Sequence, residues 1–219
     1  MLELGKIYNE DCLTFMKQVP DKYFDLVLTD PPYLIGESGQ TNKSRSCLAK
    51  SKDYGNKNWD SKELDPLIFE HIFRISKNAI IFGGNHLIHY FPYKSPCWIV
   101  WDKDNGETDF ADCELAYTNF KSAVRKYKFK WQGMLQQDMA NKETRYHPTQ
   151  KPVELFKLIL RDYAKEGFKV YDPFVGSGTT PLACEGLPHL KLEWVGTELE
   201  PDYVAIANKR LEKVQGSLF

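Results

Sequence analysis

Short apolar runs alternate with longer amphipathic segments along most of the chain. The short runs are rich in β-branched and aromatic residues, which is typical of buried strands. The longer segments repeat apolar residues every three or four positions, which is typical of helices with one buried face. The predicted strands span 24–29, 79–82, 98–101, 169–171 and 194–197, and the predicted helices span 66–76, 152–165 and 201–214. This alternation predicts an α/β fold with a doubly wound, mostly parallel sheet and helices on both faces.

Two stretches break this pattern. Residues 34–62 are polar and lack periodicity, and they predict an inserted loop because they are longer than an ordinary connection. In the second stretch, lysines alternate with Tyr127, Phe129 and Trp131. On a strand, this spacing places the charges on one face and the rings on the other. The stretch is therefore either an edge strand with buried rings and solvated lysines or a basic binding surface.

Length and composition limit the class of protein. A chain of 219 residues predicts one domain, 1–219, with a full core. Its 29 basic and 30 acidic residues nearly cancel, so bulk charge gives no argument for a nucleic-acid partner. The five cysteines lack C-x-x-C spacing, which argues against a structural zinc site and fits a reducing compartment. The N-terminus has no signal-peptide pattern and no apolar run approaches the roughly 18 residues of a membrane span, so we expect a soluble cytoplasmic protein.

A glycine-containing turn follows one predicted strand and opens a helix. It spans 172–180, Asp-Pro-Phe-Val-Gly-Ser-Gly-Thr-Thr, and Thr180 is placed to cap the helix with Pro181 at its first position. Glycines permit a tight turn and close approach of the backbone to a ligand. Glu198 ends the next predicted strand, where doubly wound sheets bind ribose hydroxyls. The pattern predicts a nucleoside-bearing cofactor, and an ordinary strand–turn–helix corner is the alternative.

The run Asp30-Pro31-Pro32-Tyr33 ends another predicted strand. The amino nitrogen of a nucleobase is a poor nucleophile, because its lone pair is conjugated into the ring. A carboxylate and a rigid backbone carbonyl would accept its hydrogens and favour the pyramidal nitrogen that attacks a methyl group. Tyr33 would offer a stacking face to a base that has left the duplex. The alternative is a surface turn, since Asp-Pro-Pro is also good turn chemistry.

Four segments resemble, in order, motifs of the S-adenosylmethionine-dependent DNA amino methyltransferases, the N6-adenine/N4-cytosine family. They are 9–13 (Asn-Glu-Asp-Cys-Leu), 30–33, 147–152 (His-Pro-Thr-Gln-Lys-Pro) and 172–180. A catalytic motif that precedes the glycine motif is the order of the β group. The resemblance implies the Rossmann-like class I methyltransferase fold and covers nearly the whole chain. Residues 34–65 and 102–146 carry no family signature, and the second of these regions is a candidate for target recognition.

The resemblance implies catalytic roles for 30–33. Asp30 and Pro31 would bind the target amino group, Pro32 completes the rigid motif, and Tyr33 would stack on the flipped base. Aspartate at the first position is usual for adenine enzymes and serine for cytosine enzymes, so we expect methylation of adenine N6. Transfer would be direct and in-line, with no metal and no covalent intermediate on the protein.

The resemblance also implies how the cofactor S-adenosylmethionine is bound. Asp11 and the backbone of Cys12 would meet its adenine, Glu198 its ribose, and Lys151 the region of its methionine carboxylate. The full implied set is Asp11, Cys12, Lys151, Asp172, Phe174, Gly176, Gly178, Thr179, Thr180 and Glu198.

Other functions remain open on the sequence. They are N4-cytosine methylation, methylation of RNA adenine, methylation of protein glutamine and a non-catalytic DNA-binding module. Pro96-Cys97 resembles the nucleophile segment of cytosine-C5 enzymes, but the apolar run that follows favours the start of a buried strand. His86 follows two glycines and is expected to serve a turn, with an approach to the site as the alternative.

Double-stranded DNA is the expected partner, and a bacterial, archaeal or phage origin fits the resemblance. The candidate DNA contacts in the polar loop are Lys43, Arg45, Lys50, Lys52 and Lys57. They would mostly meet phosphates and provide affinity rather than sequence recognition. The last residues, with Gln215, Leu218 and Phe219, resemble peptides that dock on the sliding clamp, and a frayed tail is the alternative. The sequence is also compatible with a homodimer.

Overall fold

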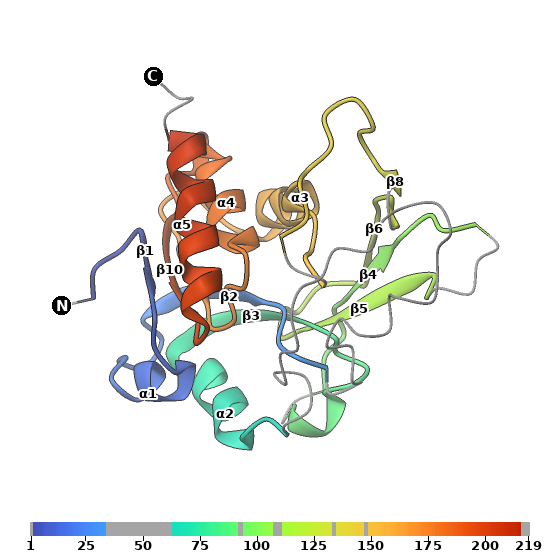
Figure 1. The fold of residues 1–219 in the computed structure, drawn as a ribbon. Helices are drawn as coiled ribbons and strands as arrows, with labels where there is room; N and C mark the ends of the chain where they lie inside the picture. Colours follow the sequence, from blue (N-terminus) through green and yellow to red (C-terminus); the bar gives the residue numbers. More distant parts are fainter. Residues whose placement is uncertain are drawn as a thin grey trace.

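The computed structural model describes residues 2–33, 63–91, 94–106, 111–132, 135–146 and 149–215. The strands of its large sheet are β1 Lys6–Tyr8, β2 Phe24–Thr29, β3 Ser76–Phe82, β4 Trp98–Asp102, β5 Cys113–Thr118, β6 Arg125–Lys128, β9 Lys169–Asp172 and β10 Glu193–Thr197. Their order in the sheet is β1-β10-β9-β2-β3-β5-β4-β6 (Figure 1). A separate pair joins β7 (Trp131–Gln132) to β8 (Leu135–Gln136).

The large sheet is mostly parallel, which confirms the predicted fold class. Neighbouring strands from β1 to β3 all run in the same direction. The described sheet has one reversed strand, β5, which is antiparallel to both β3 and β4, whereas β4 and β6 are parallel. Sequence analysis did not identify β1 or β5 as strands.

Helices cover both faces of the sheet, as predicted. The helices are α1 Cys12–Lys17, α2 Pro66–Ile75, α3 Val153–Tyr163, α4 Thr179–Glu185 and α5 Pro201–Gln215, with short 3₁₀ turns η2 Ile88–Tyr90 and η3 Pro188–Leu190. Figure 1 shows α1 and α2 on one side and α3, α4 and α5 on the other. Alternate residues of β3 divide between the two cores: Ile80 and Phe82 pack with α3 and α4, and Ile81 packs with α1 and α2.

The α2 helix passes directly into β3. The sequence pattern predicts a helix through Ser76, but the helix ends at Ile75 and Ser76 is already extended, with φ −114° and ψ 150°. The Ser76 hydroxyl and backbone N–H both bond to the Ile72 carbonyl, which would otherwise be an unsatisfied helix end. The strand is therefore three residues longer at its start than predicted.

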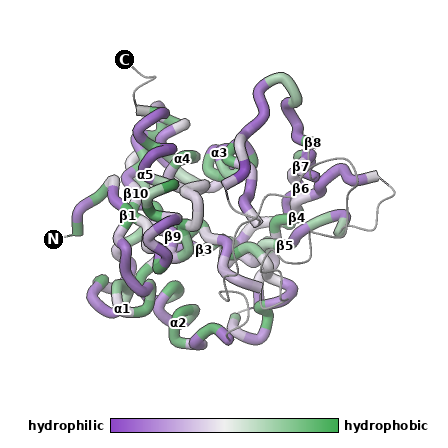
Figure 2. The backbone as a smooth tube through the Cα atoms, viewed as in Figure 1, coloured by the Kyte–Doolittle hydropathy of each residue, from purple (hydrophilic) through white to green (hydrophobic). Residues whose placement is uncertain are grey.

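The lysine–aromatic alternation lies on β6, at one edge of the sheet. Lys126 and Lys128 are exposed and pair with Asp102 and Asp104 at 3.3 and 2.8 Å, while Tyr127 packs against the core. This arrangement matches the edge-strand alternative. Figure 2 shows hydrophilic positions along this edge, whereas hydrophilic and hydrophobic positions alternate in the helices.

In the described part of the chain, no helix combines the length and apolar character needed to cross a membrane.

Candidate active site

Three neighbouring parallel strands end in carboxylates. Asp30 follows β2, Asp172 ends β9 and Glu198 follows β10, and the sheet places β2, β9 and β10 side by side. The carboxyl ends of parallel strands meet at one edge of a sheet, where open α/β folds bind their ligands. The structure therefore brings together the two motifs that the sequence separates: Thr29 bonds to Asp172 across 143 positions of the chain.

Asp172 ties the β2 strand to the glycine turn. Its buried carboxylate accepts hydrogen bonds from the hydroxyls of Thr29 and Thr180, both at 2.6 Å, and from the backbone N–H of Phe174 at 3.0 Å. Burial raises the pKa of Asp172 to about 6, although these three donors oppose the shift. With its oxygens engaged this way, Asp172 fixes the turn relative to β2.

The glycine turn has left-handed backbone at Gly176 and Gly178, with φ values of 53° and 95°. Gly178, rather than Thr180, is the N-cap residue of α4, so the predicted capping by Thr180 is wrong. Thr180 lies inside the helix, where its hydroxyl donates to Asp172 and to the Leu28 carbonyl, and Pro181 comes third rather than first. The left-handed conformation at Gly178 starts the helix two residues earlier than a cap at Thr180 would.

Glu198 lies across the glycine turn. Its two carboxylate oxygens accept the backbone N–H groups of Gly176 at 2.8 Å and of Glu200 at 2.9 Å, and burial raises its pKa. The Asn9 side chain donates to the carbonyls of Glu198 and Leu199 at 2.9 and 3.0 Å. The 9–13 segment is thus joined to the same end of β10 as Glu198.

In the 9–13 segment, Asp11 caps α1. Its carboxylate accepts the N–H and hydroxyl of Thr14 at 2.9 and 3.0 Å, and its side chain is exposed. Cys12 is buried, and burial raises the pKa of its thiol to about 12, so it is not a reactive thiolate.

Asp30 is the centre of a charged cluster. Lys151 Nζ lies 2.7 Å from Asp30 Oδ2 and 3.1 Å from Glu114 Oε2, and Lys103 Nζ lies 2.6 Å from Glu114 Oε1. The side chains of Lys151, Asp30 and Glu114 are only 5, 19 and 19% exposed. The resemblance placed Lys151 near the cofactor's carboxylate, whereas the structure pairs its ammonium with Asp30 of the other motif.

Burial sets the protonation tendencies in this cluster. It raises the pKa of Asp30, and Glu114 adds to the rise while Lys151 opposes it. Burial also disfavours the charges of Lys151 and Glu114. Attraction to Asp30 and Glu114 nevertheless raises the pKa of Lys151, and attraction to Lys151 and Lys103 lowers the pKa of Glu114. The cluster therefore favours ionised Lys151 and Glu114 beside an Asp30 that burial makes more basic.

Tyr33 is held by contacts on several sides. Its hydroxyl donates to Asp30 Oδ1 and lies 3.3 Å from Glu114 Oε2, and burial together with these carboxylates raises its pKa, so the phenol stays protonated. The His86 ring stacks on it with centroids 5.4 Å apart. His86 also forms the expected turn, through its N–H to the Gly83 carbonyl at 2.9 Å. His86 therefore both forms a turn and lies beside the Asp30 cluster, so the turn role and the approach to the site hold together.

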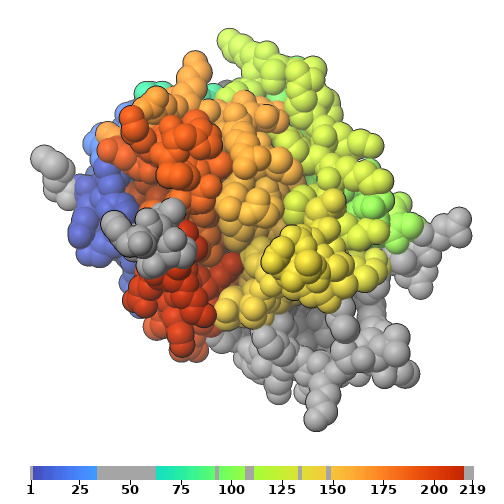
Figure 3. Space-filling view, turned by 90° about the horizontal axis from the view of Figure 1, so that it is seen from above, coloured from blue at the N-terminus to red at the C-terminus, as the bar shows by residue number. Residues whose placement is uncertain are grey.

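Further polar contacts fix the segment that precedes α3 to the glycine turn. Gln150 accepts the Ser177 hydroxyl at 3.1 Å and donates to Glu143 at 2.6 Å, and Arg210 of α5 reaches the Ser177 carbonyl at 2.6 Å and Glu143 at 2.8 Å. Thr179 donates to the Lys151 carbonyl at 3.2 Å. Figure 3 shows this segment, in yellow, beside α5, in red. The glycine turn is thus braced from two sides.

Sequence analysis missed Glu114, Lys103, Glu143 and Arg210. Glu114 and Glu143 lie in the region without a family signature, and Arg210 was part of an ordinary amphipathic helix. A charged residue directly before the apolar run Leu115-Ala116-Tyr117 was the available signal for Glu114. The partners of Glu114 are distant in the sequence, so this signal could not identify them.

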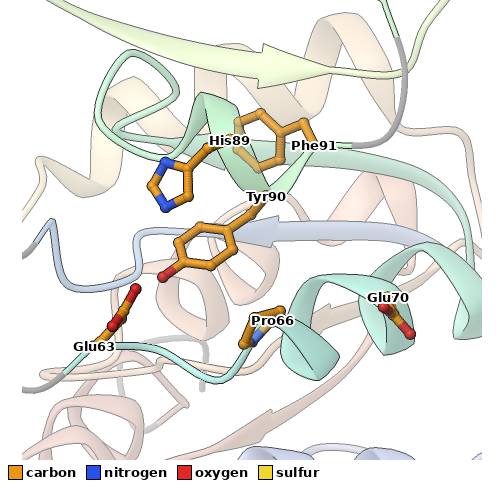
Figure 4. A pocket seen from close by; sticks show the side chains of 6 residues that line it. All are labelled: Glu63, Pro66, Glu70, His89, Tyr90 and Phe91. Atoms are coloured by element: carbon orange, nitrogen blue, oxygen red, sulfur yellow. The ribbon is translucent and has the colours of Figure 1, made fainter.

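Two cavities lie outside this cluster. One of about 440 Å³ is lined by Glu63, Pro66, Glu70, His89, Tyr90 and Phe91, between α2 and η2 (Figure 4). The other, of about 360 Å³, is lined by Ser122, Arg125, Asp162 and Tyr163. The lining residues of both belong to none of the four motif segments.

Some predictions lie outside the described residues. They concern the candidate DNA contacts Lys43, Arg45, Lys50, Lys52 and Lys57, the start of the 147–152 segment, and Leu218 and Phe219 of the candidate clamp peptide. Cys97 is buried directly before β4, as its apolar neighbours predicted. In the ranges that the structure describes, no cluster of three or more His, Cys, Asp or Glu residues could hold a metal ion.

Curated proteins and solved structures resemble the chain over nearly its whole length. It is 26% identical to the type II methyltransferase M2.DpnII of Streptococcus pneumoniae, over 94% of this chain and 89% of that protein. It is 26% identical to M.HpaI of Haemophilus parainfluenzae, over 94% and 74%. The fold is shared with M1.HpyAVI, solved with S-adenosylmethionine (TM-score 0.58, 24% identity, 94% and 98% covered). It is also shared with the cytosine-N4-specific PvuII methyltransferase (TM-score 0.61, 16% identity, 99% and 92% covered).

The family model described as DNA methylase matches residues 98–209. This range includes the glycine turn, Lys151 and Glu198, and it spans more than half of the chain. The chain therefore belongs to the DNA methylase family, that of the N6 and N4 amino methyltransferases.

Proposed function

We propose that the protein transfers the methyl group of S-adenosylmethionine to N6 of adenine in double-stranded DNA. The observation that carries the proposal is the position of Asp30. Its carboxylate follows β2, beside the end of β9 where the glycine turn begins. An acceptor for an amino group thus lies next to a turn suited to a nucleoside cofactor.

Charge and proton balance favour a carboxylate at this position. The amino nitrogen attacks the methyl carbon, the S–CH₃ bond breaks with its electron pair on sulfur, and the positive charge moves from sulfonium to nitrogen. Asp30, made more basic by burial, accepts a hydrogen bond from the amino group and then its proton, which passes to solvent. A serine hydroxyl could accept the hydrogen bond but not the proton.

The described residues fit the cofactor. The left-handed backbone at Gly176 and Gly178 favours glycine and permits the tight turn, and the absence of a Cβ at Gly178 lets the turn pack against Ala207 of α5. Glu198 is held in place by two backbone N–H groups, and its lone pairs can accept ribose hydroxyls. S-adenosylmethionine supplies the methyl group as a sulfonium, and M1.HpyAVI, which shares the fold, was solved with it.

The target base would stack on Tyr33 after leaving the duplex. The Tyr33 ring lies against Gly83, where an added Cβ would come within 2.1 Å of the ring. Gly83 thus provides the space that the ring occupies, and the ring in turn lies beside the Asp30 carboxylate.

Replacing Gly83 by alanine should displace Tyr33 and lower the methylation rate by about 10²-fold, as expected for misplaced reacting groups. The matched control is Gly167→Ala, because Gly167 has nearly the same φ (74° against 70°) but nothing within 4 Å of an added Cβ. Both variants should lose roughly 1–2 kcal/mol of stability from the left-handed backbone, measured by denaturant unfolding. Equal rates for the two variants would show that the ring position does not matter.

The proposal is tested by incubating the protein with labelled S-adenosylmethionine and unmethylated DNA, followed by mapping of the modified bases. We expect N6-methyladenine at one recognition sequence. Modified N4 of cytosine would reject the adenine assignment but keep the activity class. Transfer to RNA in preference to DNA would reject the assignment of double-stranded DNA as the substrate.

A further inference from the structure

The Lys151 ammonium bridges two carboxylates, only one of which belongs to a motif. Its Nζ lies 2.7 Å from Asp30 and 3.1 Å from Glu114, and its side chain is almost fully buried. Glu114 comes from β5, the reversed strand, and has a second cation, Lys103, at 2.6 Å. Glu114 is thus in contact with both Lys151 and, at 3.3 Å, the Tyr33 hydroxyl.

We propose that Glu114 is a positioning residue for methyl transfer, which holds the Lys151 ammonium and the Tyr33 phenol beside Asp30 while the target amino group takes its place on that carboxylate. The inference rests on the proposed function and adds to it a residue outside the motifs.

Competition for Asp30 is the first step of the argument. One Asp30 oxygen accepts the Tyr33 hydroxyl and the other accepts Lys151. The target amino group needs an acceptor on the same carboxylate, so the hydrogen bonds from Tyr33 and Lys151 to Asp30 must weaken or break when the base binds. Both already contact Glu114, which can keep them partnered when the base binds.

Charge is the second step. A buried ammonium that lost its only carboxylate would be strongly unfavourable, because the interior solvates charge poorly. With Glu114 present, Lys151 stays ion-paired whether or not Asp30 is engaged with the base. With Lys103 as well, two carboxylates and two ammonium groups balance to no net charge. Glu114 therefore allows Asp30 to change partners without leaving a buried charge alone.

The groups that face Asp30 determine how its activity should depend on pH. They are Tyr33, Lys151, Glu114 on β5 and Asp172 on β9, with Lys103 behind Glu114. The negative charge of Glu114 raises the pKa of Asp30, so removing this charge should lower that pKa. The acid limb of the rate profile, which reports the carboxylate that must be ionised, should then move to lower pH.

The test compares Glu114→Gln, Glu114→Asp and wild type in kcat, in the Kd of S-adenosylmethionine and in the pH profile of methylation. Glu114→Gln should lower kcat by about 10²-fold, leave the Kd of the cofactor unchanged and move the acid limb to lower pH. Glu114→Asp keeps the charge and should recover part of the rate with the limb near its wild-type position. The matched control is Glu166→Gln, which breaks an exposed pair with Lys191 and should change none of these quantities.

Two results would overturn the inference while wild type still methylates DNA. One is a Glu114→Gln variant with wild-type kcat. The other is a slow variant whose acid limb is unmoved and whose rate Glu114→Asp does not improve, since that pattern indicates a purely structural role. If wild type itself does not methylate DNA, the proposed function fails and the inference fails with it, so the two failures are distinguishable.

Discussion

Replacing Asp30 by alanine is expected to reduce methylation by roughly 10²- to 10⁴-fold, because the target amino group loses both its hydrogen-bond acceptor and its proton acceptor. Cofactor binding should be largely spared, since the glycine turn is fixed by Asp172, Glu198 and Arg210 rather than by Asp30. Folding should also be retained, because Glu114 remains 3.1 Å from the Lys151 ammonium. Single-turnover rates and the Kd of S-adenosylmethionine, measured on the same preparation, check both expectations.

Asp30→Asn separates the two roles of the carboxylate. Asparagine keeps an acceptor oxygen but cannot take a proton at neutral pH, so its rate should fall between those of alanine and wild type. A control is Asp21→Ala, which removes an aspartate from an exposed ion pair with Arg74 and should leave the rate unchanged. Wild-type turnover in Asp30→Ala would refute the assignment of the catalytic motif.

Replacing Glu198 by alanine is expected to weaken S-adenosylmethionine binding by roughly 10- to 100-fold, the loss expected for hydrogen bonds to a charged group. The carboxylate would bind the ribose, and it also anchors the Gly176 N–H at 2.8 Å, so both the ligand contact and the turn geometry suffer. At saturating cofactor the rate should recover most of its wild-type value, because Asp30 and its neighbours are unchanged. Isothermal titration with S-adenosylmethionine measures the first effect and kcat the second.

Glu193 supplies the matched control for this experiment. It is an exposed glutamate at the first position of β10, whereas Glu198 directly follows the last position of this strand. Glu193→Ala should bind the cofactor as wild type does. An unchanged Kd in Glu198→Ala would count against the ribose role.

Local patterns were sufficient for most of the parallel sheet. The strands β2, β4, β9 and β10 and the helices α2, α3 and α5 are confirmed to within a few residues. Each is a continuous apolar or amphipathic run, so its own residues are enough to determine its secondary structure. The short elements β1 and α1 contain few residues with a clear period, so the pattern was too weak to identify them.

The ion-pair cluster shows what local patterns cannot give. Glu114 was missed, and the pairing of Lys151 was not predicted, because their partners are distant in the sequence. Lys151 lies 121 positions from Asp30, and Glu114 lies 81 positions from Tyr33. Their pairing depends on the reversal of β5 after β4, and the turn signal Asn105-Gly106 between these strands was not interpreted as a reversal. The misplaced Thr180 cap has the same cause: Asp172 and Leu28 attract its hydroxyl, and both are tertiary partners.

The placement of β2 beside β9 makes the order of the motifs along the chain immaterial to the site. One half of the site comes from the segments before β7 and the other from Lys151 to Glu198, and the halves meet along two strand pairs, β2 with β9 and β1 with β10. At the far edge, α5 packs near β1. A circular permutant opened between 137 and 142, with the original ends joined by a flexible linker, would place the glycine motif before Asp30. It should keep the same strand order, and with it the same chemistry, because neighbours in the sheet rather than neighbours in the chain build the catalytic centre.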